Sequence, residues 1–207
     1  MNKLIKKEAR YLAGNYKTFP LTITKGRDIY LYDATGKRYY DFMAGYSAVN
    51  QGHCHPRIVK SLINQSQKLT LCSRAFANDK LAEYSEYICN LLNYEKILPT
   101  NTGVEAGETA VKLARSWGYN VKKIDKYKAK IIFAENNFWG RTITAASSSS
   151  DPLAYENFGP FTPGIIKVPY NNVEAIADLL ANDEEICAIM LEPIQGEAGI
   201  IIPDNDY

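Results

Sequence analysis

The residues best suited to chemistry lie in Thr100–Lys112, a stretch whose pattern is that of the start of a helix. Thr102 is a good helix N-cap, and Glu105, three residues further on, completes a capping box that satisfies two amides of the first turn. The amides of Gly103 and Val104 would then stay free at the positive end of the helix dipole, where a phosphate or carboxylate binds without a cationic side chain. These residues alone also fit an ordinary capped helix, because capping boxes are common.

A second set of candidates, Phe138, Trp139 and Arg141, follows the apolar run Lys130–Ala134. Ligands of α/β proteins bind at the carboxyl ends of strands. An aromatic face can stack on a flat heteroaromatic ring, and a guanidinium can hold a carboxylate through two hydrogen bonds. Judged by residue type alone, core packing for the two aromatic residues and a loop ion pair for Arg141 are the favoured roles.

Two further groups could do chemistry. Glu192 and Glu197 follow the clearest strand pattern of the chain, Ile186–Leu191, and would either face a ligand there or cap turns. The triplet His53-Cys54-His55 invites a metal site. We expect none, because adjacent loop residues rarely converge on one ion and these are the only two histidines of the chain. A metal-binding module stays open as an alternative for testing.

Hydrophobic periodicity predicts the elements that hold these residues. Residues 21–46 alternate apolar and polar side chains around the turn Asp33–Lys37, which indicates a β-meander. Residues 145–163 read as a long loop, and residues 122–128 as a solvated lysine-rich loop. The expected helices are 57–68, 79–93, a helix from the capping box to about 119, and 173–181; the expected strands are 96–99, 130–134, 165–168 and 186–191.

Composition excludes several classes of function. The net charge of +1 favours neither nucleic acid nor acidic lipid as a partner. No apolar run approaches the roughly 20 residues of a membrane span. The four cysteines have no paired spacing, which indicates reduced thiols, and Glu8 argues against a transit peptide in the basic start Met1–Arg10. We therefore expect a cytoplasmic protein.

The string Asn101–Ala110 resembles the phosphate-binding segment of class III aminotransferases, which use pyridoxal 5′-phosphate (PLP), and most of all their ornithine aminotransferase branch. Gly45–Pro56, Ser73–Phe76 and Glu192–Gly199 match further segments of that branch. The resemblance implies an α/β fold: the three-layer PLP-dependent transferase fold (fold type I) with a mostly parallel central sheet. Residues 1–46 would contribute to a small α+β domain, and residues 47–207 would form the first half of the large PLP-binding domain.

The resemblance also implies roles for single residues. Two backbone amides of the capped helix start would hold the cofactor phosphate, Phe138 would stack on the PLP ring, and Arg141 would bind the α-carboxylate of ornithine. Glu197 would moderate how the site treats ornithine and glutamate. The implied cofactor-binding residues are Thr102, Gly103, Val104, Phe138, Trp139 and Glu192, and the implied substrate-binding residues are Tyr16, Tyr46, Arg141 and Glu197.

By resemblance, the complete enzyme is a homodimer that moves the δ-amino group of L-ornithine to 2-oxoglutarate, giving glutamate 5-semialdehyde and glutamate. In the family, the Schiff-base Lys and the Asp at the ring nitrogen come after the matched region, so we expect no catalytic residue here. Asp183 precedes its strand and would lie at the wrong end of the sheet. We expect the N-terminal half of such an enzyme; the alternatives are another ω-aminotransferase, acting on acetylornithine or 4-aminobutyrate, and a catalytically dead fragment.

One physical pattern points the same way. The strand Ile186–Leu191 is apolar on both faces, which is typical of a strand in the middle of a sheet. With no strand of useful length after it, the strand would form a bare apolar edge, which natural folds avoid.

Overall fold

The computed structural model describes residues 3–207 and divides into two compact units, Met1–Tyr87 and Ile88–Tyr207, which are described separately. The domain assignment predicted from the family, 1–46 and 47–207, stays a prediction. No helix among the described residues is both long and apolar enough to cross a membrane.

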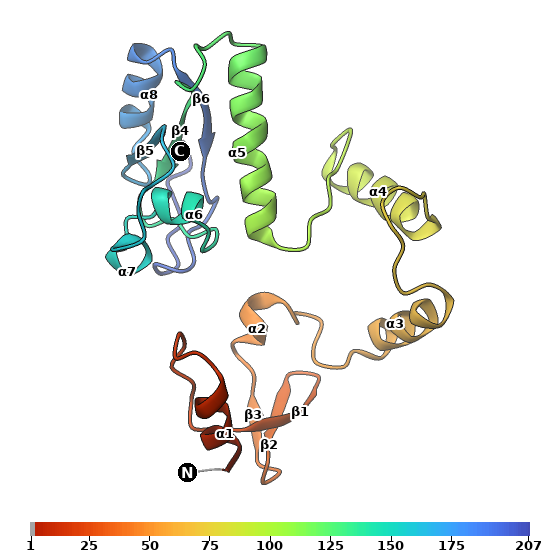
Figure 1. The fold of residues 1–207 in the computed structure, drawn as a ribbon. Coiled ribbons are helices and arrows are strands. Elements are labelled where there is room, and N and C mark those ends of the chain that lie inside the picture. The colour runs from red at the N-terminus through yellow and green to blue at the C-terminus, as the bar shows by residue number, and fades with distance from the viewer. Residues whose placement is uncertain (1–2) are drawn as a thin grey trace. The chain divides into compact units, whose positions relative to one another are not determined.

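The first unit contains helix α1 (Lys3–Tyr11) and an antiparallel sheet of β1 (Ile23–Arg27), β2 (Tyr30–Asp33) and β3 (Arg38–Tyr40) (Figure 1). The strands pair in chain order, so the predicted β-meander is confirmed.

Asp33 organises the turn after β2. Its Oδ1 accepts hydrogen bonds from the amide and hydroxyl of Thr35 at 2.8 and 2.7 Å, and its Oδ2 accepts one from the Tyr39 hydroxyl at 2.9 Å. The Thr35 hydroxyl is the main reason that the pKa of Asp33 falls to about 2. The turn is therefore built around a carboxylate that stays charged.

Three helices follow: α2 (Ala44–Ser47), α3 (Pro56–Lys68) and α4 (Asp79–Leu92), the last of which spans the division between the units. Pro56 occupies the first turn of α3, where its missing N–H costs nothing. The predicted helices 57–68 and 79–93 are confirmed. The predicted strand 96–99 is wrong: this segment is irregular and has no strand partner among residues 3–207, and Pro99 could not donate to one.

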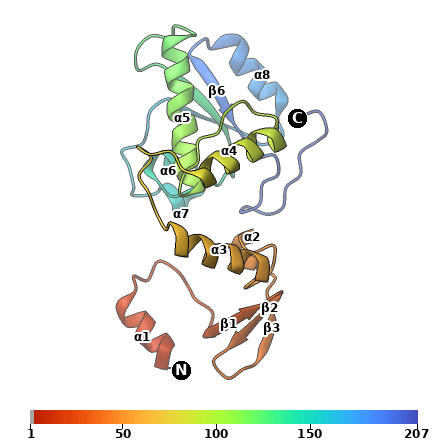
Figure 2. The ribbon, with the colours of Figure 1, turned by 90° about the vertical axis from the view of Figure 1, so that its right-hand side faces the viewer.

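The second unit is a parallel sheet in the order β5 (Ile165–Val168), β4 (Lys130–Ala134), β6 (Ile186–Met190). Helix α5 (Gly103–Asn120) covers one face of the sheet and α8 (Val173–Asn182) covers the other (Figures 1 and 2). All five of these elements were predicted, and they form three layers.

Alternation along β4 supplies both faces of the core. Ile131 and Phe133 pack with Val111 of α5, whereas Ile132 points to the opposite face and packs with Leu179 of α8. Strand β4 is the middle strand and is buried from Ile131 to Ala134, and β6 is an edge strand of the described sheet with Ile189 40% exposed. The apolar pattern of 186–191 thus marks a strand whose outer edge has no partner among the described residues.

Residues 145–163 are not the featureless loop that was predicted. They include most of α6 (Ile143–Ser148) and all of α7 (Pro152–Tyr155). Thr142 caps α6 by accepting a hydrogen bond from the Ala145 amide at 3.2 Å, and Asp151 caps α7 in the same way. Helices this short show no hydrophobic period, so only their caps could have revealed them.

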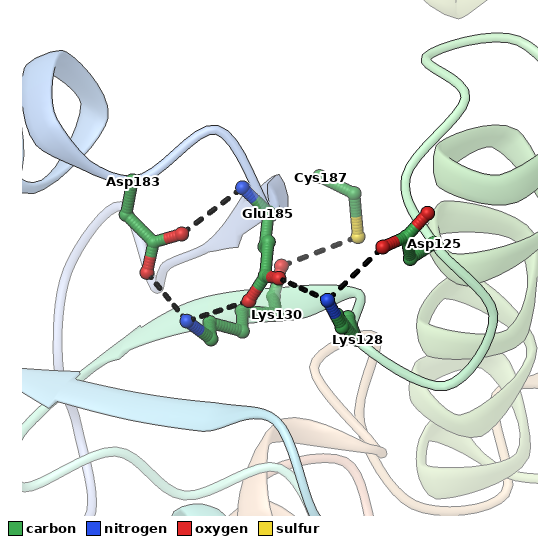
Figure 3. A network of polar contacts seen from close by, with 6 residues as sticks. All are labelled: Asp125, Lys128, Lys130, Asp183, Glu185 and Cys187. Carbon is green, nitrogen blue, oxygen red and sulfur yellow. Dashed lines mark hydrogen bonds and ion pairs between the residues drawn. The ribbon is translucent and has the colours of Figure 1, made fainter.

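A polar network fastens the amino ends of β4 and β6 (Figure 3). Lys130 pairs with Asp183 at 2.8 Å and with Glu185 at 2.9 Å, and Lys128 pairs with Asp125 at 3.0 Å. Asp183 therefore lies at the amino edge of the sheet, as its place before the strand predicted.

The lysines of the loop 122–128 are exposed, as predicted, but two of them also bind polar groups of distant segments. Lys122 donates to the backbone oxygen of Ile186 at 2.7 Å, and Lys128 joins the network of Figure 3. Carbonyl and carboxylate groups at the start of β6 attract these ammonium groups, a contact between distant segments that the loop sequence alone does not contain.

Candidate functional site

The start of α5 has the geometry of an anion site. The predicted capping box is complete: the Thr102 hydroxyl accepts from the Glu105 amide at 3.2 Å, and Glu105 Oε2 accepts from the Thr102 amide at 2.9 Å. The amides of Gly103 and Val104 have no acceptor among the described residues. Because a Cβ at Gly103 would meet no neighbouring atom within 4 Å, a ligand can approach this backbone.

Glu105 also accepts from the Asn101 amide at 2.7 Å. The Asn101 side chain is the first cause that holds the pKa of Glu105 below its usual value, followed by the Thr102 amide. The carboxylate is thus occupied by the turn preceding the helix, and the free amides beyond it remain available to an anionic ligand.

The loop between β4 and α6 carries Phe138 and Arg141 at the carboxyl edge of the sheet. The Phe138 amide donates to Glu192 Oε1 at 2.9 Å, which ties this loop to the one that follows β6. The Phe138 ring is 44% exposed. Arg141 is exposed and forms no ion pair with any described residue, so the loop ion pair favoured by residue type is absent. Both side chains are open to a ligand.

Trp139 has a different setting from its neighbours. Its ring lies 6.0 Å from that of Phe133 with 13° between the planes, and its Nε1 donates to the Ser148 hydroxyl at 2.8 Å. It packs in the core beneath the loop, as residue type alone favoured. Its assignment to cofactor binding stays a prediction.

Two glycines, one in helix α5 and one in this loop, allow the helix and the loop to pack closely together. The Trp139 ring occupies the space where a Cβ of Gly107 would lie, and the Val104 side chain occupies the corresponding space at Gly140. Gly140 has φ of 153°, a conformation that side chains other than glycine rarely adopt. The free amides of α5 and the Phe138 loop therefore belong to one packed assembly.

Sequence reasoning missed Gln195, which is completely buried beside the loop. Its Nε2 donates to the backbone oxygen of Glu135 at 2.7 Å, while its own backbone pairs with Ile201. Its Oε1 is buried without a partner among the described residues. The only signal was its place inside the matched string after Glu192; the second carboxylate of that string, Glu197, is exposed.

In the first unit, the structure brings together Tyr16 and Tyr46, whose hydroxyl groups are hydrogen-bonded to each other. Both side chains are more than half exposed. His53, from the triplet considered for metal binding, instead hydrogen-bonds Asp41 at 2.7 Å. Within residues 3–207, no group of three His, Cys, Asp or Glu side chains is placed to hold a metal ion.

A parallel sheet between helical layers, with a free helix start beside an aromatic and cationic loop, defines a ligand-binding α/β protein. Residues 11–207 match the family model for Aminotransferase class-III, and the chain therefore belongs to the class-III aminotransferases.

Known proteins of this family resemble the chain closely. It is 55% identical over 204 residues to the mitochondrial ornithine aminotransferase of Rattus norvegicus, covering 99% of this chain and 46% of that protein. The crystal structure of ornithine aminotransferase from Toxoplasma gondii ME49 superimposes with a TM-score of 0.95 at 44% identity, over 99% of this chain and 48% of that one. Acetylornithine aminotransferase from Elizabethkingia anophelis gives a TM-score of 0.82, also at 44% identity, over 97% and 46%.

These likenesses confirm the predicted PLP-dependent transferase fold of type I. The chain spans about half the length of the curated relatives it matches. The predicted cytoplasmic location is wrong, since the relatives from Rattus norvegicus, Drosophila ananassae and Caenorhabditis elegans are named mitochondrial. Unpaired cysteines indicate a reducing environment and do not distinguish among reducing compartments.

Proposed function

We propose that the protein carrying this chain is a PLP-dependent ornithine aminotransferase that converts L-ornithine and 2-oxoglutarate to glutamate 5-semialdehyde and glutamate as a homodimer. The similarity to ornithine aminotransferases supports the choice of reaction. The observation that carries the proposal is the pair of free amides at Gly103 and Val104, packed against the loop with Phe138 and Arg141.

The residues present fit PLP. Its phosphate matches the two free amides, which the helix dipole and the Thr102 cap direct outward. The half-exposed Phe138 ring offers a face for a flat heteroaromatic ring, and Glu192 fixes that residue through its backbone amide. When bound, PLP supplies an electron sink for charge that develops at a substrate carbon.

The substrate groups find complementary side chains. Arg141 presents an unpaired guanidinium, which binds a carboxylate through two hydrogen bonds. Tyr16 and Tyr46 provide two converging hydroxyls for the α-amino acid end of ornithine, and Glu197 an exposed carboxylate that we assign to substrate discrimination. We assign proton transfer to no described residue. Lys130 and Asp183 bond each other at the opposite edge of the sheet.

A second candidate, acetylornithine as amino donor, is favoured by the equal 44% identity to an acetylornithine aminotransferase structure. The two substrates differ at one amino group, which is charged in ornithine and acylated in acetylornithine. Tyrosine hydroxyls and carboxylates are hydrogen-bond partners that suit the charged form. We therefore place ornithine first.

The test uses the purified full-length gene product that carries this chain, supplied with PLP and 2-oxoglutarate. Ornithine, acetylornithine and 4-aminobutyrate are compared as donors by their kcat/KM values. We expect ornithine to be preferred and Arg141→Lys to lower kcat/KM by about tenfold or more, because lysine cannot form the bidentate contact. Lys112→Arg, on the exposed face of α5, is the matched control. Preference for another donor would reassign the substrate, and PLP binding without turnover of any donor would refute the enzymatic proposal.

A further inference from the structure

The segment that carries Tyr46 has an unusual backbone. Four successive residues, Ala44 to Ser47, have φ values of 46°, 59°, 56° and 67°, so that α2 is a left-handed turn. Only Gly45 adopts this region readily; the other three bear side chains that disfavour it. Such a conformation persists where surrounding contacts determine it, and it is often found at functional sites.

The carboxylate of Asp41 supplies the contacts on the side where the chain enters the left-handed turn. Asp41 Oδ1 accepts from the amides of Met43 and Ala44 at 3.1 and 3.0 Å. Asp41 Oδ2 accepts from His53 Nε2 at 2.7 Å, and only 8% of the Asp41 side chain is exposed. The pKa of Asp41 lies below its usual value, first because of the bond from His53 and then through the two amides.

His53, which follows the left-handed turn in the chain, anchors that segment to the β-meander. Its amide donates to the backbone oxygen of Asp28 at 2.7 Å, and the Asp28 amide donates back at 3.0 Å. Its ring lies against Gly26 of β1, where a Cβ would come within 2.6 Å of the imidazole Cγ. Both ends of the left-handed turn are thus joined by one hydrogen bond and anchored to the meander.

We propose that Asp41 and His53 are positioning residues that hold the left-handed turn and thereby aim the Tyr46 hydroxyl at that of Tyr16, where the amino acid substrate binds. The proposal rests on the proposed function in naming the substrate, but its geometry lies wholly within the first unit. Neither residue touches the substrate: Asp41 acts through the turn and His53 acts through Asp41.

The test is a double-mutant cycle in the full-length protein that carries this chain. His53→Leu is expected to raise the KM for ornithine about tenfold, with kcat changed less than twofold. The reason is that Tyr46 loses its orientation, whereas the reacting groups keep theirs. Tyr46→Phe is expected to give a rise of similar size. If His53 acts through Tyr46, the double variant binds ornithine no worse than Tyr46→Phe alone, so that the two effects are not multiplicative.

Two further variants separate positioning from folding. Asp41→Asn keeps an oxygen for the two amides and is expected to be milder than Asp41→Ala. Gly26→Ala keeps both the Asp41 and His53 side chains in the protein but displaces the His53 ring. It is therefore expected to raise the KM in the same way even if His53→Leu fails to fold. His55→Leu is the matched control, since the His55 Nδ1 has no hydrogen-bond partner among the described residues.

The outcomes are distinct. A wild-type protein that turns over no ornithine refutes the proposed function. A wild-type protein that turns over ornithine, with multiplicative effects of His53→Leu and Tyr46→Phe or a normal KM in Gly26→Ala, refutes the positioning role. A crystal structure of His53→Leu is expected to show residues 44–47 relaxed from the left-handed region, and an unchanged turn would overturn the inference irrespective of activity.

Discussion

Replacing Gly107 by alanine tests whether helix α5 and the Phe138 loop form one packed assembly. The added Cβ would lie 2.7 Å from Cζ3 of Trp139, and still closer to a second ring atom, where ordinary contacts lie at 3.4–4 Å. The ring cannot retreat freely, because it stacks on Phe133 and its Nε1 is bonded to Ser148. Either α5 shifts or Trp139 leaves its position.

The expected magnitude has two parts. Forcing an extra methyl group into a packed core costs about 1–3 kcal/mol. Alanine in place of glycine inside a helix returns about 1 kcal/mol. We therefore expect Gly107→Ala to lower the free energy of unfolding by about 1 kcal/mol, and the melting temperature by roughly 3 °C for a folding unit of about 200 residues.

Gly103→Ala in the same helix is the matched control, because its Cβ meets no neighbouring atom within 4 Å. It is expected to leave stability unchanged or slightly higher, while impeding a phosphate at the helix start. Urea unfolding measures both variants. The chain has two tryptophans, so the emission of Trp139 is followed in a Trp117→Phe background.

We expect Gly107→Ala to shift the Trp139 emission and to weaken PLP binding, because the Phe138 loop moves with its anchor. A variant as stable as wild type with unchanged Trp139 emission would refute the close packing of α5 against the loop. Loss of stability without a spectral shift would mean that the helix, and not the tryptophan, gives way.

Three other predictions follow from single contacts. Gln195→Met is expected to change stability by less than about 1 kcal/mol, since the lost bond to the Glu135 oxygen is offset by removal of a buried unpaired Oε1; a loss above about 3 kcal/mol in urea unfolding would contradict this offset. The pKa of Asp33 falls from its unfolded value to about 2 on folding, so its contribution is complete above about pH 4 and is lost as the pH falls toward 2. Asp33→Asn should flatten thermal stability over that window, and an unchanged slope would contradict the prediction. Lys130→Met is expected to lower the melting temperature more at low than at high salt, because it removes both ion pairs of Lys130; equal losses at both would argue against an ionic origin.

The sequence predicted the elements with strong periodic or capping signals. The capping box at Thr102 and Glu105, the meander, and the strands of the parallel sheet were all confirmed, because each depends on residues close together in the chain. What the sequence did not predict depends on distant segments. The strand expected at 96–99 has no strand partner among the described residues, and the exposed Lys122 finds an acceptor on β6 that its own loop does not contain.

The candidate site divides in the same way. The capping pattern identified the free amides, and the family resemblance identified Phe138 and Arg141. Residue type alone favoured the core position of Trp139, whereas the buried role of Gln195 needed the structure. No periodic pattern marks a buried glutamine such as Gln195, which holds its loop through one hydrogen bond to a backbone oxygen. The left-handed turn at Tyr46 was equally hidden, since only one of its four residues is glycine.

The two ends of the parallel sheet are held by different forces, and this difference bears on function. Ion pairs of Lys128 and Lys130 join the amino ends of β4 and β6, and salt weakens such pairs because it shortens the screening length to about 3 Å near 1 M. At the carboxyl ends, Glu192 accepts the Phe138 amide and Gln195 donates to a backbone oxygen, so the two loops are bonded in both directions. The bond from Gln195 is neutral and buried, and salt does not screen it. High salt should therefore loosen the edge away from the candidate site first, and the loops that would hold PLP should keep their geometry until the sheet itself unfolds.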